Sequence, residues 1–193
     1  MKKYELTKET KTLADGTVLH RICALRDIQR YSVKARDLGG WIEKYDNLSQ
    51  DGDAWVSCNA QVSGNAWVSG NARVCDDAWV SGDARVYGDA RVCDDAWVSG
   101  DARVYGNARV YGNARVCGDA DYMVFKNSWS SGRYFTYTHS NKMWVVGCFN
   151  GTGKELIAKA YKDSKLSGKC YEAIVRAVET IEAAKAEAIG GAE

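Results

Sequence analysis

The chain has 193 residues, of which 46% are hydrophobic, and its formal net charge is +1. This composition excludes general disorder and suits one compact domain or a solenoid with small capping modules. The chain contains no long apolar run and no apolar stretch behind its basic N-terminus, so the sequence predicts a cytoplasmic protein that does not bind a membrane.

Charge is distributed unevenly along the chain. Residues 1–45 carry ten Lys and Arg against six acids, residues 46–121 carry six against twelve, and residues 122–193 carry ten against seven. Nonspecific nucleic-acid affinity depends on Lys and Arg that neutralise phosphates. The acidic middle segment is therefore not expected to bind duplex nucleic acid.

Residues 1–45 are expected to form a β cap. In the stretch TLADGTVLHRI, the pair Asp15-Gly16 stands where a hairpin turn would lie. The stretch DLGGWIEKYDNLS then leads into the first repeat. The cap would cover one open end of the repeat segment that follows.

A hexad of the form G/D-D/N-A-x-V-x runs from Gly52 to Cys117. Val recurs every six residues from Val56 to Val116, and an Ala stands four residues after each Val. This period suits short strands separated by sharp corners, with Val inward and Ala in the corner, and suits neither a helix nor one long strand. Gly, Asp and Asn at the corners tolerate unusual backbone angles.

A longer repeat is superimposed on the hexads. DDAWVSGDARVYGDARVC at 76–93 is followed directly by DDAWVSGDARVYGNARVY at 94–111, and 16 of 18 positions agree. Three hexads therefore make one coil. Parallel strands stacked about 4.8 Å apart would give about four coils a length of about 20 Å.

The spacing in VYGDAR and VSGNAW, an aliphatic residue and a small residue four positions later, resembles the hexapeptide-repeat family. The resemblance covers roughly residues 40–123. It implies a left-handed parallel β-helix with three sides. Because such proteins commonly form trimers along their faces, it also implies a homo-oligomer, either a dimer or a trimer.

Residues that flank each Val should point outward and form columns along the three faces. One interpretation is that these side chains only stack on one another along the sheet. The other is that they bind another chain, because Trp, Tyr and Arg are enriched at binding hot spots. The candidate binding surface consists of Trp55, Trp67, Trp79, Trp97, Arg73, Arg85, Arg91, Arg103, Arg109, Arg115, Tyr87, Tyr105 and Tyr111.

One predicted corner column contains Cys58, Asp76 and Asp94, and Cys75 and Cys93 directly precede the two Asp. No metal site is predicted there, because no His is near in sequence and a corner Asp typically accepts backbone N–H groups. The spacing of coils would allow a Cys75–Cys93 disulfide. Seven cysteines without a CxxC pair in a reducing compartment nevertheless favour free thiols.

The family resemblance implies acyl transfer first, because many hexapeptide proteins are CoA-dependent acyltransferases with a catalytic His at a coil edge. The two histidines, His20 and His139, lie outside the repeats. Two are too few for the three-His zinc site of the γ-class carbonic anhydrases on this scaffold. GCFNGTGKE at 147–155 lacks the phosphate-loop spacing, and Thr152 to Glu155 is typical of a helix capping box. The sequence predicts no catalytic residue, cofactor or metal.

After the last hexad, GRYFTYTH and KMWVVGCF predict two strands, and helices are expected near 152–163 and 169–189. The second helix has one apolar face from Tyr171 to Ile181, which packs either on the strand pair or on another protein. The expected fold is mainly β. It has an N-terminal β cap at 1–45, a left-handed parallel β-helix of about four coils at 46–123, and a C-terminal ββαα module at 124–193.

Over nearly its full length the chain also resembles a group of phage and prophage proteins of obscure function, through YELT, ALRD, DLGGWIE, DNLS, the hexads and a GCF strand before the helices. This resemblance implies a setting inside a bacterium. We therefore expect a non-enzymatic protein that occupies a host or phage protein, for example as an inhibitor of antiviral defence.

Two alternatives stay open. The first is a sponge for a small nucleotide signal, bound in clefts between subunits by Arg73, Arg91, Arg103 or Arg109 and by stacking Trp or Tyr. The second is an acyltransferase with an unorthodox base.

Overall fold

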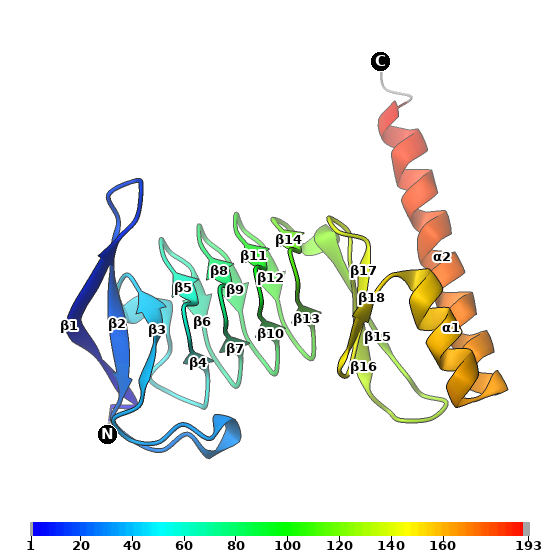
Figure 1. The fold of residues 1–193 in the computed structure, drawn as a ribbon. Coiled ribbons are helices and arrows are strands. Elements are labelled where there is room, and N and C mark those ends of the chain that lie inside the picture. The colour runs from blue at the N-terminus through cyan, green and yellow to red at the C-terminus, as the bar shows by residue number, and fades with distance from the viewer. Residues whose placement is uncertain (1, 191–193) are drawn as a thin grey trace.

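The computed structural model describes residues 2–190. The molecule has three parts in chain order (Figure 1). They are a set of N-terminal antiparallel strands, a parallel β-solenoid of about four turns, and a C-terminal antiparallel sheet covered by two helices. The mainly β architecture and its three parts agree with the sequence prediction. No helix of residues 2–190 is long and apolar enough to cross a membrane.

The N-terminal cap is a hairpin that continues into the solenoid. Strands β1 (Tyr4–Thr12) and β2 (Val18–Ala24) pair antiparallel around the expected turn, where Gly16 has a φ of 88°. Strand β3 (Leu38–Ile42) pairs antiparallel with β2 and parallel with β5 of the solenoid. The cap therefore extends one of the three solenoid sheets and covers the open end of the core.

The loop between β2 and β3 carries the short 3-10 helix η1 (Gln29–Tyr31), and η2 (Tyr45–Asn47) precedes the first coil. The core of the solenoid begins just after η2. There Leu48 forms a parallel bridge with Val68 and is 1% exposed.

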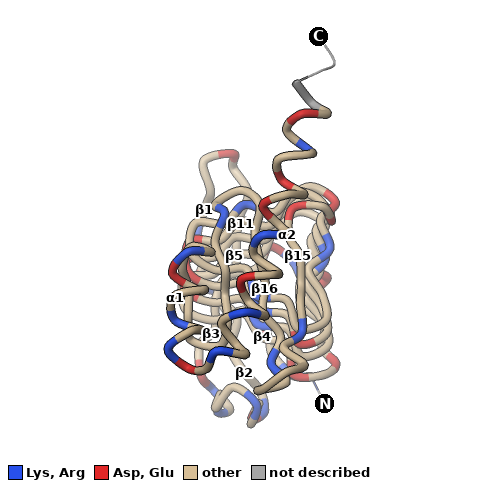
Figure 2. Tube along the Cα trace, turned by 90° about the vertical axis from the view of Figure 1, so that its right-hand side faces the viewer, with Lys and Arg blue, Asp and Glu red and all other residues tan. Residues whose placement is uncertain are grey.

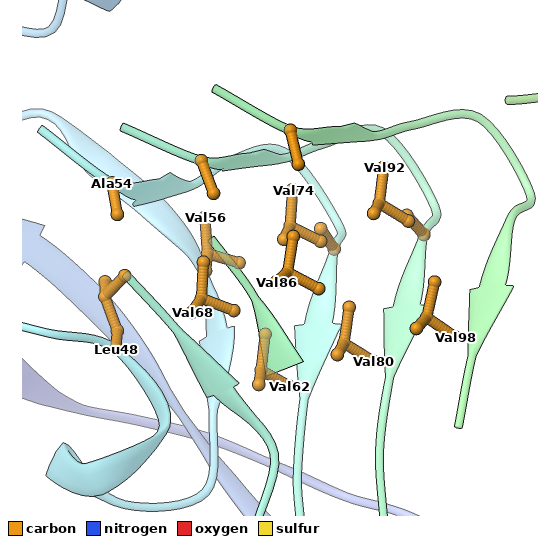
Figure 3. Close-up of a cluster of buried hydrophobic side chains, with 14 of the residues drawn as sticks. Leu48, Ala54, Val56, Val62, Val68, Val74, Val80, Val86, Val92 and Val98 are labelled. Carbon is orange, nitrogen blue, oxygen red and sulfur yellow. The ribbon is translucent and has the colours of Figure 1, made fainter. Parts of the chain in front are cut away.

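The solenoid strands are short, because each side of the prism holds one hexad. They are β4 (Trp55–Val56), β5 (Gln61–Val62), β6 (Trp67–Val68), β7 (Arg73–Val74), β8 (Trp79–Val80), β9 (Arg85–Val86), β10 (Arg91–Val92), β11 (Trp97–Val98), β12 (Arg103–Val104), β13 (Arg109–Val110) and β14 (Arg115–Val116). Every Val of these strands is fully buried, and the corner Ala residues fill the space between them (Figure 3).

The corners adopt the left-handed backbone that the sequence predicts. Gly64, Gly82 and Gly100 have φ values of 66°, 67° and 62°. The three residues that replace Gly in the repeat, Cys58, Asp76 and Asp94, have similar values of 57°, 60° and 60°. The non-glycine corners therefore keep the geometry of the others.

The C-terminal module has a larger sheet than the sequence predicts. After η3 (Asp119–Asp121), its elements are β15 (Tyr122–Lys126), β16 (Tyr134–Thr138), β17 (Met143–Val146), β18 (Phe149–Gly151), α1 (Gly153–Asp163) and α2 (Lys165–Gly190). The two expected strands correspond to β16 and β17. Strand β15 pairs with β16 and β18 pairs with β17, so the ββαα prediction missed both outer strands.

The apolar face of α2 packs within the same chain. Tyr171, Val175 and Val178 join Phe135 and Trp144 of the sheet in a second hydrophobic core. Of the two partners considered for this face, the intramolecular one is observed. Ile181, farther along α2, is 43% exposed and lies beyond this core.

Candidate binding surfaces

Each side of the solenoid forms its own parallel sheet. The tryptophan face consists of β5, β8, β11 and β14, the tyrosine face of β6, β9 and β12, and the arginine face of β4, β7, β10 and β13. Pairing runs in register from coil to coil, for example Trp97 with Trp79 and Arg103 with Arg85. The side-chain columns expected from the 18-residue repeat are therefore present.

The tryptophan face is a continuous stack. The rings of Trp79 and Trp97 lie 4.9 Å apart at 8°, and the guanidinium of Arg115 lies 5.5 Å from the Trp97 ring. The indole N–H groups donate to Ser63 and Ser81, each at 3.4 Å. The aromatic and polar groups of this face thus satisfy each other along the sheet.

The tyrosine face carries the two most exposed aromatic side chains of the solenoid strands and corners, and its sheet contains no strand from either end module. Trp67 is 42% exposed and Tyr105 is 50% exposed. Tyr87 stacks on Tyr105 with ring centroids 5.4 Å apart, and Arg85 and Arg103 are exposed beside them. These five side chains form one aromatic and basic surface.

Tyr122 extends the tyrosine face toward the C-terminal module. Its hydroxyl donates a hydrogen bond to the carbonyl of Arg103 at 2.7 Å. Burial raises the pKa of Tyr122 to about 12, so the hydroxyl keeps its proton at neutral pH. This contact fixes the C-terminal module against the third coil.

The arginine face carries Arg73, Arg91 and Arg109 in one column. Arg73 lies 5.5 Å from the ring centre of Tyr31, and Nη1 of Arg109 donates to the Gly147 carbonyl at 2.8 Å. Tyr111, at the corner after β13, is half-buried. Residues from both end modules therefore partly cover this face.

Trp55 must be removed from the candidate surface. Its side chain is 1% exposed, because Tyr4 of β1 packs against it edge-on with ring centroids 6.5 Å apart. The prediction that Trp55 points away from the Val core is compatible with this, since the N-terminal cap covers the outside of β4. Trp55 belongs to the hydrophobic core.

The prediction that all cysteines are reduced is wrong for one pair. Cys75 and Cys93 form a disulfide, with Cα atoms 4.7 Å apart. Stacked coils bring equivalent corner residues to this separation, and the two side chains are nearly buried. Asp76 lies beside them, and one ligand atom of each of the three residues is within 4.8 Å of the others. Because the two sulfurs are bonded to each other, neither offers a thiolate to a metal.

The histidines lie in the two end modules, away from the solenoid strands. His20 is half-buried on β2. Nδ1 of His139 contacts the carboxylate of Glu182 of α2 at the edge of a cavity of about 530 Å³ between the C-terminal sheet and α2. Burial, with Glu182 and Glu179 nearby, raises the pKa of Tyr137 in this cavity to about 12.

Sequence reasoning missed the residues that the end modules add to the arginine face. These are Arg30 and Tyr31 from the β2–β3 loop and Arg133 and Tyr134 from the β15–β16 hairpin. The excess of basic residues at 1–45 and 122–193 was the one available signal. This excess of charge did not indicate which residues reach the arginine face, because neither loop belongs to the periodic segment.

Comparison with known families agrees with the geometry of the solenoid. The YdcK beta solenoid repeat model matches residues 60–76, 66–82, 84–100 and 102–118, all within the solenoid. No curated protein matches the chain. The four matched segments leave both end modules uncovered, so the family evidence concerns the repeats. The central segment of this chain is similar to the YdcK beta-solenoid repeat.

Proposed function

We propose that the protein is a non-enzymatic binding protein that presents its tyrosine face to another protein. The observation that carries this proposal is the exposure of large aromatic side chains there, 42% for Trp67 and 50% for Tyr105. Exposed Trp, Tyr and Arg side chains that share one rigid surface are typical of binding hot spots. The short in-register strands hold them in place, which lowers the entropy lost on binding.

The partner that we propose is a host or phage protein inside a bacterial cell. The resemblance of the whole chain to phage and prophage proteins supports this setting. An inhibitor of antiviral defence needs only to occupy its target, and this requires a rigid surface and no catalytic group.

Affinity capture from bacterial lysate tests the proposal. The variant carries Trp67→Ser and Tyr105→Ser, and the matched control carries Trp97→Ser, which removes an exposed aromatic ring from the tryptophan face. Wild type and control should retain one specific protein that the tyrosine-face variant loses. Capture that is equal for all three proteins would contradict the proposal.

Light scattering separates a foreign partner from self-association. If the tyrosine face binds a second copy of the chain, the wild type will have a multiple of the 21.2 kDa chain mass and the tyrosine-face variant will be monomeric. That result would assign the face to the expected dimer or trimer and overturn its assignment to a host or phage protein.

A further inference from the structure

One cavity on the arginine face is lined mainly by arginines. Its lining residues, here called the arginine cleft, are Arg30, Asp89, Arg91, Asn107, Arg109, Arg133 and Tyr134, and its volume is about 240 Å³. The N-terminal loop, two solenoid strands and the β15–β16 hairpin all contribute to it. Figure 2 marks the Lys and Arg positions of the chain in blue and the Asp and Glu positions in red.

The charges of the arginine cleft are not balanced. Asp89 is its one carboxylate among the residues that the structure describes, and it pairs with Arg30. The side chains of Arg91 and Arg133 form no ion pair or hydrogen bond within residues 2–190. Three guanidinium groups of the lining, including that of Arg109, therefore lack a carboxylate.

The column position of Arg91 increases this imbalance. It pairs in register with Arg73 on one side and with Arg109 on the other, at the spacing of adjacent parallel strands, about 4.8 Å. Like charges directly opposite each other on a sheet are destabilising. An anion between these side chains would remove the repulsion and gain several charge-assisted hydrogen bonds.

Two of the four cleft arginines, Arg30 and Arg109, are also held in position before any ligand arrives. Arg109 donates to the Gly147 carbonyl at 2.8 Å, and Asp89, which holds Arg30, also accepts from Asn71 at 3.2 Å. Preorganised donors lose less entropy on binding.

We infer that the arginine cleft binds a small phosphorylated ligand. The planar guanidinium fork matches phosphate oxygens in two-point contacts, and several forks converge here. The cavity suits one or two phosphate groups. Tyr134 at its rim is 37% exposed and offers a ring on which a nucleotide base could stack.

Calorimetry with pyrophosphate tests this inference. The variants are Arg91→Gln and Arg133→Gln, and the matched control is Arg103→Gln, which changes the same hexad position on the tyrosine face. Wild type and control should bind pyrophosphate with equal affinity, and each cleft variant should bind at least about tenfold more weakly. Circular dichroism checks the fold, and Arg133 lies outside the solenoid, so its loss leaves the repeats intact.

A second titration distinguishes two sources of the phosphate. If the ligand is a nucleotide, ATP should bind more tightly than pyrophosphate, and Tyr134→Ala should remove the difference. If the ligand is a phosphate compound without a base, the two affinities should be equal and unaffected by Tyr134→Ala. Both results support the cleft as a phosphate site.

Two results would overturn the inference. One is the absence of measurable binding of pyrophosphate and ATP to the wild type. The other is binding that Arg91→Gln and Arg133→Gln leave unchanged. Neither result bears on the tyrosine face, because the two surfaces lie on different sides of the prism.

Discussion

Corner glycines of the solenoid differ in the space that they leave for a side chain. Gly82 and Gly106 have φ values of 67° and 65°, but a Cβ on Gly82 would lie 2.9 Å from the backbone N of Gly100, whereas one on Gly106 would meet nothing within 4 Å. Gly106→Ala should therefore cost only the left-handed strain, about 1–2 kcal/mol. Gly82→Ala should lower the free energy of unfolding by about 1–3 kcal/mol more, because of the clash with the backbone of the next coil.

Urea unfolding of both variants measures this difference, and Gly106→Ala is the matched control for backbone strain. Equal losses in the free energy of unfolding would show that the next coil moves away freely. That outcome would contradict the tight corner stacking described above.

Lys3 is a buried cation in the N-terminal cap. Its Nζ donates to the Ala54 carbonyl at 2.8 Å. Burial, and secondarily the charge of Arg26, lowers its pKa from 10.5 to about 8, although Asp53 and Asp51 act in the opposite direction. Between pH values of about 8 and 10.5 the unfolded chain binds more protons at Lys3 than the folded chain does. Stability should therefore rise with pH in this window, because the penalty for a buried charge disappears.

The contribution of Lys3 is isolated by comparison with Lys3→Met. The urea midpoint of the wild type should rise relative to that of the variant between pH values of about 8 and 10.5. A difference between the two proteins that stays constant over this range would show that Lys3 titrates normally in the folded state.

At the scale of single residues, the sequence predicts the direction in which a side chain points better than it predicts how much of that side chain is exposed to solvent. The 18-residue period predicts that Trp55, Trp79 and Trp97 point away from the Val residues. Trp79 and Trp97 stack on each other along the tryptophan face, whereas Trp55 is buried in the same hydrophobic cluster as the Val residues. Whether such a side chain meets solvent depends on other segments. Tyr4 covers Trp55, and nothing in the spacing of the repeats indicates that contact.

The Cys75–Cys93 disulfide links two consecutive coils at the end of β7 and β10. It closes a loop with a sequence separation of 18 residues, so we expect it to add about 2–3 kcal/mol to the free energy of unfolding. Under denaturing conditions without reductant, alkylation should label five of the seven cysteines. After reduction it should label all of them.

Cys93→Ser is the control for the disulfide. Reductant should lower the stability of the wild type and leave that of the variant unchanged. If the unreduced wild type already takes up a label at every cysteine, the pair is not bonded in solution.

At the scale of elements, prediction succeeded where the pattern is periodic. Each hexad is one side of the prism, so the repeat fixes strands, corners and pairing register together. Strands β15 and β18 were missed for two different physical reasons. The predicted end of the β-helix at residue 123 falls inside β15, which directly follows the last hexad. Strand β18 is only three residues long and leads directly into α1.

At the scale of the whole molecule, the solenoid is a spacer whose length is counted in coils. The interactions between coils are similar along its axis, so its stability should be close to a sum over neighbouring coils. The end modules, in contrast, contact particular faces. Arg109 N–H donates to Thr136 of the C-terminal sheet at 2.9 Å, and Trp41 of β3 pairs with Gln61 of β5.

This arrangement predicts that a larger deletion will be tolerated better than a smaller one. Deletion of residues 76–93 removes one coil, so β7 then pairs with β13, Arg73 meets Arg109, and every Val keeps its inward position. Deletion of residues 76–90 joins Cys75 to Arg91, which leaves three residues where a side of the prism needs six. Without a corner between Val74 and Val92, the strands above cannot stack in register on those below.

Urea unfolding followed by circular dichroism compares the two deletions. The 18-residue deletion should unfold in one cooperative transition, with a smaller denaturant dependence because less surface becomes exposed. The 15-residue deletion should lose cooperativity or have a much lower midpoint. If both deletions unfold alike, the coils tolerate a broken hexad, and stacking of the strands in register is not required for stability.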